Sequence, residues 1–366
     1  MRALVAVSFG TRQSCLEVPK GLEGNVLRIV VVANLWPSPR RPAWGSFVSN
    51  RVDALRRLGH QVQVVACHDH PSAPLRYASL AGRVLRAATG RRAPNTIVEA
   101  HIAHPTGLFA APLAARLQAP LVLFAHGSDV LRLPDRSGLD RTICQAVFRR
   151  AALVVANTGY LAREVTERLA VPQDKVQVVS PGIQYKTFAS ATAVRTTELL
   201  FVGNLIHRKA VDVLIAALAA MPDPPPLRVI GDGPERAALE QQAAAAGVKA
   251  DFAGAMPQEA VAVEMAAAKL IAVPSREEAL GLVALEAMAA GCIPVVSAVG
   301  GLAESVRDGV NGFSCAPEDP AALAAALERA RAADLAALRE AARATAEPHD
   351  VDVAAAETAG RFEALL

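Results

Sequence analysis

The sequence predicts an α/β protein with two domains, each built on a doubly wound parallel sheet, that face a central cleft. Its 366 residues exceed what one ordinary hydrophobic core contains. Short apolar runs rich in valine and isoleucine alternate with amphipathic stretches, which is the pattern of buried parallel strands joined by helices. The pattern restarts once, because the runs at 29–35 and 199–205 both lead from a strand into Asn-Leu and then a loop.

Eight apolar runs are the predicted strands, and helices are expected between them. Ligands of such sheets bind at the carboxyl ends of the strands, so the loops after the strands are the expected sites of chemistry. The expected helices include 46–59, 209–221, 281–291, the alanine-rich segment 320–346 and the C-terminus. The predicted strands are LRIVVVANL (27–35), QVQVVA (61–66), APLVLFAHG (119–127), AALVVANT (151–158), ELLFVGNL (198–205), PLRVIGDG (226–233), KLIAVPS (269–275) and CIPVVS (292–297).

These elements divide the chain into five segments. Residues 1–25 precede the first convincing strand and form an N-terminal extension of unknown role. The first domain spans 26–189, the small polar segment 190–198 is the expected linker, and the second domain spans 199–348. Residues 349–366 form a C-terminal helix that could pack back on the first domain.

Composition narrows the expected location and partners. No apolar stretch approaches the roughly 20 residues that cross a bilayer, and the N-terminus lacks the apolar run of a secretory signal. The five scattered cysteines predict free thiols in a reducing cytoplasm. The chain through Ser190 holds 24 Lys and Arg against 11 Asp and Glu, whereas the rest holds 14 against 24. The basic half could face an anionic membrane at its inner surface, face an acidic substrate or be a solvated surface; no nucleic acid is expected.

The segment PSREEALGLVALEAMAAGCIPVVS at 274–297 carries two carboxylates in otherwise apolar surroundings. Glu278 lies in a strand-to-helix loop, and Glu286 lies at the margin of the apolar stripe of the helix that begins near Gly281. The first N–H groups of that helix, at 281–283, have no partner within it and favour a phosphate. Two carboxylates beside an anion site suit a sugar nucleotide. Alternatively, Glu278 caps the helix and Glu286 pairs with an arginine.

This segment resembles the E-x7-E signature of retaining glycosyltransferase family 4, whose members have the GT-B fold of two Rossmann-like domains. Ala279 and Leu280 depart from the family, where glycine and an aromatic residue are usual. The resemblance covers most of residues 28–366 and fades at 68–95, the variable acceptor region. It rests on Ser275-x-x-Glu278-x-x-Gly281-Leu282-x-x-x-Glu286-Ala287-Met288-Ala289, then Gly291, Pro294-Val295-Val296 and Gly300-Gly301-x-x-Glu304.

The resemblance implies that the first domain binds an acceptor and the second a donor. A sugar would pass from a nucleoside diphosphate sugar, UDP-linked in our expectation, to a hydroxyl of a glycan, lipid or small metabolite, with retention of anomeric configuration. Glu278 would hold a sugar hydroxyl and Glu286 the ribose hydroxyls. The leaving diphosphate would rest on Lys209 and on the amides at 281–283, so no metal, cofactor or protein base is expected.

Two further segments carry the resemblance. Residues 201–218 are similar to the family's phosphate-binding segment, in which Lys209 matches the family's lysine. Asn204 stands where many members carry arginine, Ala210 replaces a usual glycine, and Arg208 is a candidate substitute for the arginine. Otherwise Lys209 is a solvated residue at a helix start. The stretch FAHGSDV at 124–130 resembles the family's His-Gly-x-Asp, which implies that His126 contacts the donor sugar.

We therefore expect catalytic roles for three residues and donor contacts from a larger set. The expected catalytic residues are His126, Glu278 and Lys209. Gly45 precedes the first helix, the glycines of VIGDGPERAAL at 229–239 lie near the nucleoside in this family, and Met256 lies near the base. The expected donor-binding residues are Gly45, Asn204, Arg208, Lys209, Gly231, Gly233, Met256, Glu278, Gly281, Leu282, Val283 and Glu286.

Other motifs and other functions are less well supported by the sequence. The run CHDH at 67–70 resembles metal ligands, but neighbouring residues on a strand point to opposite faces and no second cluster completes a site. His101 and His104 have no acid pair or nucleophile motif around them. The alternative functions are a GT-B-type sugar-nucleotide epimerase, which would need more acid and base side chains, and a non-catalytic module that binds sugar nucleotides.

Overall fold

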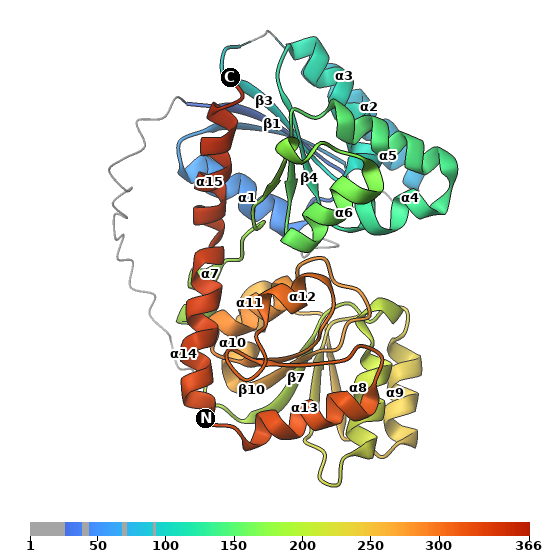
Figure 1. Ribbon diagram of the computed structural model, residues 1–366, viewed down its shortest axis with the longest axis vertical. Helices are drawn as coiled ribbons and strands as arrows, with labels where there is room; N and C mark the ends of the chain where they lie inside the picture. Colours follow the sequence, from blue (N-terminus) through green and yellow to red (C-terminus); the bar gives the residue numbers. More distant parts are fainter. Residues whose placement is uncertain (1–25, 39–43, 68–71, 91–92) are drawn as a thin grey trace, which may run out of the picture.

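The computed structural model describes residues 26–38, 44–67, 72–90 and 93–366, and within these residues the chain forms two lobes (Figure 1). Each lobe holds one parallel sheet of six described strands. The strand order is β2-β1-β3-β4-β5-β6 in the first lobe and β12-β11-β10-β7-β8-β9 in the second. The predicted fold class, two doubly wound parallel sheets, is confirmed. The predicted extension at 1–25 lies outside the described residues.

The first sheet is buried on both faces because alternate residues of its strands point to opposite sides. Val30 and Val32 face the core under α2, α3 and α5, whereas Ile29 and Val31 face the core under α1 and α15. The elements of this lobe are β1 (Arg28–Ala33), α1 (Ser46–Arg57), β2 (Gln61–Ala66), α2 (Ala73–Ala88), β3 (Thr96–His101), η1 (Ala103–Gly107), α3 (Leu108–Leu117), β4 (Leu121–Ala125), η2 (Ser128–Arg132), α4 (Leu133–Arg136), α5 (Gly138–Arg150), β5 (Leu153–Ala156), α6 (Gly159–Leu169), η3 (Gln173–Lys175) and β6 (Val176–Val178).

The second lobe has one continuous core around its sheet. Aspartates begin two of its helices, because Asp319 and Asp334 accept hydrogen bonds from the free N–H groups of the first turns of α13 and α14. The elements from α7 onward are α7 (Tyr185–Ser190), β7 (Thr197–Val202), η4 (His207–Lys209), α8 (Val211–Ala220), β8 (Leu227–Ile230), α9 (Arg236–Ala245), β9 (Ala250–Gly254), α10 (Gln258–Ala267), β10 (Ala268–Val273), α11 (Leu282–Ala289), β11 (Ile293–Ser297), α12 (Gly300–Ser305), β12 (Phe313–Cys315), α13 (Pro320–Ala332), α14 (Leu335–Ala346), η5 (Glu347–His349) and α15 (Val351–Glu363).

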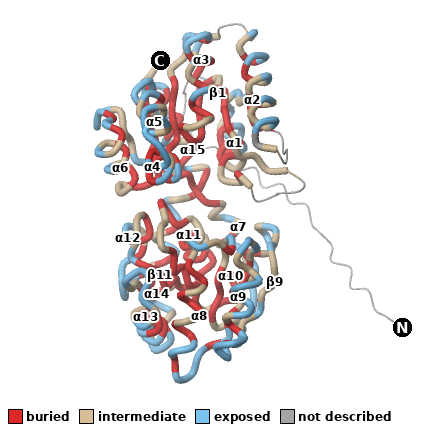
Figure 2. The backbone as a smooth tube through the Cα atoms, turned by 90° about the vertical axis from the view of Figure 1, so that its right-hand side faces the viewer, coloured by how far each residue is buried: buried red, intermediate tan, exposed pale blue. Residues whose placement is uncertain are grey.

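The last two helices lead the chain back to the first lobe. Figure 1 shows α14 along the second lobe and α15 along the first. Ala355, Ala359 and Phe362 of α15 are buried in the same cluster as Val52 and Leu55 of α1. Figure 2 shows that the buried residues gather in the middle of each lobe. The lobes are therefore joined by a helix that belongs to the core of the first one.

All eight predicted strands are present, as β1, β2, β4, β5, β7, β8, β10 and β11. Four strands were not predicted: β3, β6, β9 and β12. Of these, β6 and β12 have three residues each and lie at sheet edges, so they carry no long apolar run. By contrast, β3 is a fully buried inner strand. It was missed because Glu99 and His101 interrupt its apolar run.

The strand orders decide where a ligand can approach each sheet. In the second sheet β10 lies beside β7, and in the first sheet β3 lies beside β1. At these two positions the order along the sheet reverses, so the loops that leave neighbouring strands turn away from each other. The loops concerned are 203–210 and 274–281 in the second lobe, and those that follow Ala33 and His101 in the first.

Candidate active site

Lys209 and Glu278 meet where the strand order of the second sheet reverses. Lys209 ends the turn η4 after β7, and Glu278 lies in the loop after β10. Lys209 Nζ donates a hydrogen bond to Glu278 Oε2 and forms an ion pair with it. The two side chains are 15% and 13% exposed, and the buried Ser275 hydroxyl lies 3.4 Å from the same carboxylate oxygen. The structure thus brings together two of the three expected catalytic residues.

The helix α11 starts with free N–H groups beside this ion pair. Gly281 precedes the helix at φ 80°, and a Cβ there would lie 2.3 Å from Leu302 Cδ2, so only glycine fits. The first intrahelical bond is from Ala284 N–H to the Gly281 carbonyl. The N–H groups of Gly281, the half-buried Leu282 and the half-buried Val283 therefore have no backbone acceptor among the described residues. No side chain caps α11, so the alternative that Glu278 is its cap does not hold.

Glu286 lies on α11 with one weak partner. Its Oε1 accepts a hydrogen bond of 3.5 Å from the side-chain amide of Gln258 on α10, and it forms no ion pair with an arginine in the described part of the chain. Burial raises the pKa of Glu286 to about 8, although the bond from Gln258 acts in the opposite direction. Gln258 could not be singled out from the sequence, because a glutamine in the first turn of a helix is common.

Arg276 fixes the segment that carries Lys209 and Arg208. The Arg276 N–H donates to the Arg208 carbonyl at 2.9 Å, and its guanidinium pairs with Asp212 and Glu318. The Arg208 Nε is buried and has no hydrogen-bond partner among the described residues. Asn204 is exposed in the same loop. Of the two, Arg208 therefore offers an unused donor close to Lys209.

The glycines predicted to lie near the nucleoside have a packing role. A Cβ on Gly231 would lie 1.9 Å from the Gly203 carbonyl oxygen, and one on Gly233 would lie 2.3 Å from the Leu205 carbonyl oxygen. Both glycines therefore let the loop after β8 pack against the loop after β7. Met256 is half-buried against the core of the second lobe.

Gly45 plays a similar part in the first lobe. It precedes α1 at φ 75°, and a Cβ there would lie 2.6 Å from the Leu35 carbonyl carbon. Glycine at this position allows the loop after β1 to lie against the start of α1.

His126 is the end of a chain of hydrogen-bonded side chains in the first lobe. Its Nε2 lies 2.9 Å from His101 Nδ1, and His101 Nε2 lies 2.7 Å from Glu99 Oε1. Arg51 of α1 binds both oxygens of Glu99, at 2.9 and 3.0 Å. The statement that His101 has no acid pair is therefore wrong. Glu99 and His101 are two residues apart on β3, so their side chains point to the same face, and this spacing was the missed signal.

Electrostatics favour a charged Glu99 and a neutral His126. Burial alone would raise the pKa of Glu99, but Arg51 and the hydrogen bond from His101 lower it to about 2. Burial holds the pKa of His126 well below its ordinary value. Asp129 accepts hydrogen bonds from the N–H groups of His126 and Ala103, both at 3.0 Å, and so holds the turn that presents His126.

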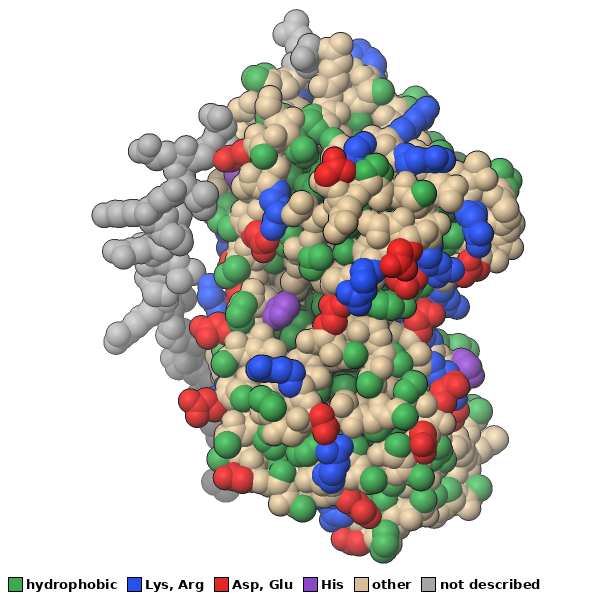
Figure 3. Space-filling model, viewed as in Figure 1, with side chains coloured by type: hydrophobic (Ala, Val, Ile, Leu, Met, Phe, Trp, Pro, Cys, Tyr) green, Lys and Arg blue, Asp and Glu red, His purple; other side chains and the backbone are tan. Residues whose placement is uncertain are grey.

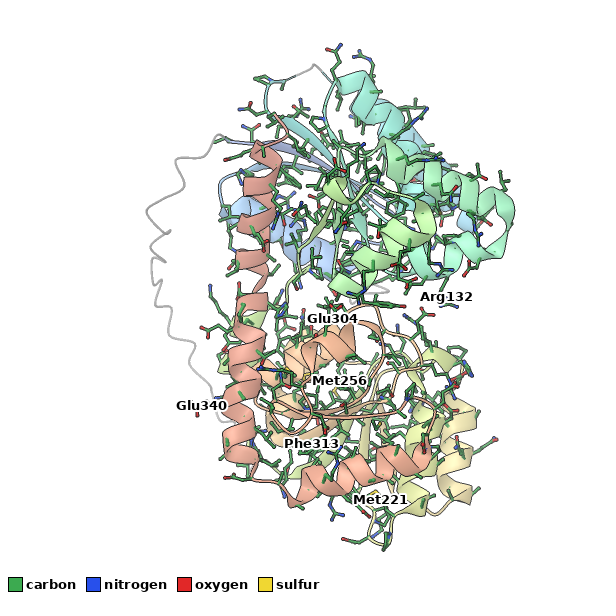
Figure 4. All side chains as sticks on the ribbon, in the orientation of Figure 1. Arg132, Met221, Met256, Glu304, Phe313 and Glu340 are labelled. Carbon is green, nitrogen blue, oxygen red and sulfur yellow. The ribbon has the colours of Figure 1, made fainter. Side chains whose placement is uncertain are left out.

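The loops that carry His126 and Glu278 contact each other across the two lobes. Ala279 lies so close to Gly127 that a Cβ on the glycine would be 2.6 Å from the Ala279 Cβ. The Thr158 hydroxyl donates to the Ala279 carbonyl at 3.0 Å. Glu304 accepts hydrogen bonds from the N–H groups that start α6. Figure 3 shows charged side chains of both signs along this boundary, and Figure 4 places Glu304 on it.

A cavity of about 870 Å³ opens at the reversal point of the first sheet. Arg132 and Arg136 on its wall are exposed and form no ion pair within the described residues, whereas Asp135 pairs with Arg141 and Arg168. Figure 4 shows Arg132 on the edge of the first lobe that faces the second. The Asn34 Oδ1 is buried and has no hydrogen-bond partner among the residues that the structure describes. The lining residues are Asn34, Tyr77, Ile102, His104, Pro105, Ser128, Arg132, Leu133, Asp135 and Arg136.

The described residues contain no group of three or more His, Cys, Asp and Glu side chains placed to hold a metal ion. Of the run at 67–70, the three residues 68–70 lie outside the described part of the chain, and Cys67 is a buried free thiol.

Two family profiles match consecutive parts of the chain. The one described as glycosyl transferases group 1 matches residues 186–347, and the one described as Glycosyltransferase Family 4 matches residues 45–186. Together they cover residues 45–347, which include every described strand except β1.

Curated relatives match over different shares of their length. The D-inositol 3-phosphate glycosyltransferase of Mycolicibacterium vanbaalenii is 30% identical in an alignment of 315 positions that covers 75% of this chain and 68% of that protein. The protein of the same name from Geodermatophilus obscurus is 38% identical in an alignment of 210 positions that covers 50% of this chain and 46% of that protein. A glycogen synthase of Mycobacterium tuberculosis is 32% identical in an alignment of 261 positions that covers 67% of this chain and 62% of that protein. The chain spans about half the length of the first relatives it matches.

Solved structures with the same fold cover nearly all of the chain. HepE of Anabaena, in complex with UDP and glucose, superposes with a TM-score of 0.75 at 21% identity and covers 92% of this chain and 100% of its own. The sucrose-phosphate synthase of Thermosynechococcus elongatus gives 0.75 at 19% identity, with 93% of this chain and 99% of its own covered. At these identities the similarity concerns the fold, and the predicted GT-B architecture is confirmed.

We expect Glu286→Gln to stabilise the protein increasingly as the pH rises. With a folded-state pKa of about 8 against an ordinary 4.5, the native carboxyl keeps a proton that the unfolded chain loses between these pH values. Stability therefore falls with rising pH, by at most about 1.4 kcal/mol per pH unit. Glutamine removes this penalty, so thermal unfolding from pH 5 to 9 should give a Tm difference between variant and wild type that grows with pH.

The matched control is Glu259→Gln, which makes the same change at an exposed position on α10. Its Tm difference should not depend on pH. A Glu286→Gln difference that stays constant or shrinks with pH would contradict the raised pKa of Glu286.

Proposed function

The chain belongs to glycosyltransferase family 4, and from this membership we propose that it transfers a sugar from a nucleoside diphosphate sugar to a hydroxyl acceptor. The observation that carries the proposal is the arrangement at the reversal point of the second sheet. There, Lys209 and the unpaired N–H groups of 281–283 lie beside two carboxyl groups, Glu278 and Glu286. This combination suits a diphosphate flanked by two hydroxyl-bearing rings.

The leaving diphosphate gains negative charge as the glycosidic bond breaks. The Lys209 ammonium and the free N–H groups at the start of α11 are fixed before the reaction, so they stabilise that charge with little reorganisation. When the donor binds, Lys209 would either leave Glu278 for the diphosphate or contact both groups at once. Arg208, whose Nε lacks a partner, would supply a second cation where other family members use an arginine.

The carboxyl groups would select the donor on either side of the diphosphate. Glu286 would bind the ribose hydroxyls, because it is half-buried and Gln258 only partly uses its hydrogen-bonding capacity. Glu278 would bind a hydroxyl of the sugar, and His126 would meet that sugar from the first lobe. The contact between Ala279 and Gly127 supports this arrangement, since it holds the two loops together.

We further propose that the reaction retains the anomeric configuration, needs no metal and uses UDP-sugars. The acceptor proton would pass to the leaving phosphate oxygen on the same face, so no protein base is assigned. These details follow from the family resemblance and from the cationic and amide donors present. HepE, which shares the fold, was crystallised with UDP and glucose.

The acceptor would bind in the cavity of the first lobe, beside Arg132 and Arg136. Two exposed arginines without ion pairs among the described residues favour an acceptor that carries an anionic group. Relatives named D-inositol 3-phosphate glycosyltransferase suggest a phosphorylated polyol as one candidate. A hydroxyl of such an acceptor would reach the donor sugar at the boundary between the lobes.

The test is to incubate the protein with radiolabelled nucleotide sugars and candidate acceptors. We expect acceptor-dependent release of nucleoside diphosphate, unchanged by EDTA, and a product whose NMR coupling shows the donor's anomeric configuration. Lys209→Ala should lower turnover by about 100-fold or more, and Glu286→Gln should weaken donor binding by about tenfold. Lys269→Ala, which breaks an ion pair with Glu198 away from the site, is the control.

The outcomes separate the alternatives. Absence of release with every donor would favour a binding module without catalysis. Interconversion of nucleotide sugars without release would favour an epimerase. Loss of activity in EDTA would contradict the account based on Lys209 and the helix amides.

A second prediction concerns the acceptor. Arg132→Ala and Arg136→Ala should each raise the KM for a phosphorylated acceptor by about tenfold, while the KM for the donor stays unchanged. Arg150→Ala, another exposed arginine of the first lobe outside the cavity, should leave both values unchanged. Equal effects of the three variants would show that the cavity arginines do not bind the acceptor.

Contact with a membrane from the cytoplasmic side is also part of the proposal. No described helix has the length and apolar content to cross a bilayer. However, α2 carries Arg76, Arg83 and Arg86 without any acidic residue, and it exposes Leu75 and Leu85 by 56% and 69%. Tyr77 of the same helix lines the cavity. An anionic bilayer against α2 would therefore place the cavity close to lipid-borne acceptors.

Flotation with vesicles that contain anionic phospholipid should show binding at low salt that weakens as salt rises. Replacing both Leu75 and Leu85 by serine should weaken binding at every salt concentration. The control is Val263→Ser, which removes an exposed hydrophobic residue from the second lobe. Failure of the wild type to bind at low salt would refute the membrane contact.

A further inference from the structure

The first lobe contains a buried row of side chains, Arg51–Glu99–His101–His126, that reaches the boundary with the second lobe. We propose that Glu99 and His101 fix the proton of His126 on Nε2, so that Nδ1 is presented to the donor sugar as a hydrogen-bond acceptor. The proposal rests on the proposed function for the identity of the ligand. The tautomer of His126 itself is inferred from the hydrogen bonds of the first lobe alone.

The first step fixes the proton of His101. Glu99 is fully buried, and its two oxygens already accept hydrogen bonds from Arg51 Nε and Nη2. An ionised carboxylate can only accept hydrogen bonds. His101 Nε2, at 2.7 Å from Glu99 Oε1, must therefore carry a proton.

The other nitrogen of His101, Nδ1, carries no proton. If both nitrogens carried protons, His101 and Arg51 would place two positive charges around the single charge of Glu99. His101 and Arg51 are each only 2% exposed, so the excess charge would be desolvated. Asp129 is engaged by the N–H groups of Ala103 and His126 rather than by either ring. A neutral His101 with a free lone pair on Nδ1 balances the charge.

The lone pair on His101 Nδ1 determines which nitrogen of His126 carries the proton. His101 Nδ1 then accepts a hydrogen bond, and His126 Nε2 at 2.9 Å is its donor. The ring of His126 also packs against Phe47, with 4.7 Å between centroids. The low pKa of His126 agrees with a neutral ring. A neutral imidazole that donates through Nε2 has its lone pair on Nδ1.

The consequence is a preference in ligand chemistry. A ring nitrogen with a lone pair accepts a hydrogen bond from a sugar hydroxyl, whereas the opposite tautomer or an imidazolium would donate to an oxygen. Glu99 and His101 are positioning residues in this scheme, because they act through His126 and touch no substrate. Arg51 keeps Glu99 ionised and is held from the other side by Thr358 on α15.

The test is NMR of the full chain labelled with ¹⁵N-histidine, without substrate, because protonated and unprotonated ring nitrogens differ widely in chemical shift. The signals of His101 and His126 are assigned with His101→Phe and His126→Asn. Near neutral pH, both rings should be neutral and carry the proton on Nε2. An imidazolium at either position, or a proton on Nδ1 of His126, would overturn the proposal.

Activity provides the second measurement. Glu99→Gln and His101→Phe should lower kcat by about 10–100-fold, and UDP should bind with unchanged affinity because its site is in the second lobe. His101→Phe keeps the packing against Phe124 and the Arg51–Glu99 pair, so it remains informative if Glu99→Gln does not fold. In it, His126 should lose its fixed tautomer.

The matched control is Thr358→Val, which removes a hydrogen bond to Arg51 but leaves Glu99, His101 and His126 unchanged. It should lower the Tm while the histidine signals stay as in the wild type and kcat stays within about twofold. If Thr358→Val lowers kcat as much as His101→Phe, or if His101→Phe leaves kcat unchanged, the positioning role is refuted. If the wild type transfers no sugar, the proposed function fails, whereas the NMR still decides the tautomer.

Discussion

The first lobe depends on one buried ion pair, between Arg51 and Glu99. Arg51 comes from α1, Glu99 from β3, and the same guanidinium donates to Thr358 on α15. Removing one partner of such a pair leaves a buried charge and typically costs about 3–5 kcal/mol. The pair therefore locks a helix, a strand and the C-terminal helix together. It also keeps Glu99 ionised, which is the condition for the ordered bonds from His101 to His126.

In the second lobe, the half-buried carboxyl of Glu286 has few hydrogen-bond partners, unlike that of Glu99. Glu99 has its hydrogen bonds satisfied by Arg51 and His101, whereas Glu286 has only a bond of 3.5 Å from Gln258. A carboxylate whose hydrogen bonds are all made fixes the orientation of the side chains that donate to it. An unsatisfied one raises the free energy of the folded protein and keeps hydrogen-bonding capacity for a ligand. The contrast is consistent with the proposed roles, positioning for Glu99 and ligand binding for Glu286.

The sequence predicted the fold well because parallel strands buried on both faces are continuous apolar runs. It failed at β3 because polar residues at two alternate positions, Glu99 and His101, replace apolar ones there. Both residues belong to the hydrogen-bonded row that ends at His126, so the missed strand and the missed hydrogen bonds have one cause. Glu278 and Glu286 could be singled out from the sequence because both lie within one short segment. Gln258 and Arg51 could not, since only the fold brings them to Glu286 and Glu99.

The lobes are held together by two contacts of different kinds. The helix α15 buries Phe362 and two alanines in the core of the first lobe, and apolar burial of this kind is lost only by unfolding. At the boundary, by contrast, Glu304 binds the N–H groups at the start of α6, and Thr158 binds the carbonyl of Ala279. Such polar groups exchange their partners for water at a small net cost.

The same boundary explains how the chain accommodates a departure from its family. Ala279 stands where glycine is usual, and its methyl group occupies space that any side chain at position 127 would need. Gly127 follows His126 at φ 100° and, as a glycine, leaves room for this methyl group. The additional methyl group is thus accepted because the facing residue is glycine. Its position between the two loops means that a larger residue at 279 or 127 would separate His126 from Glu278.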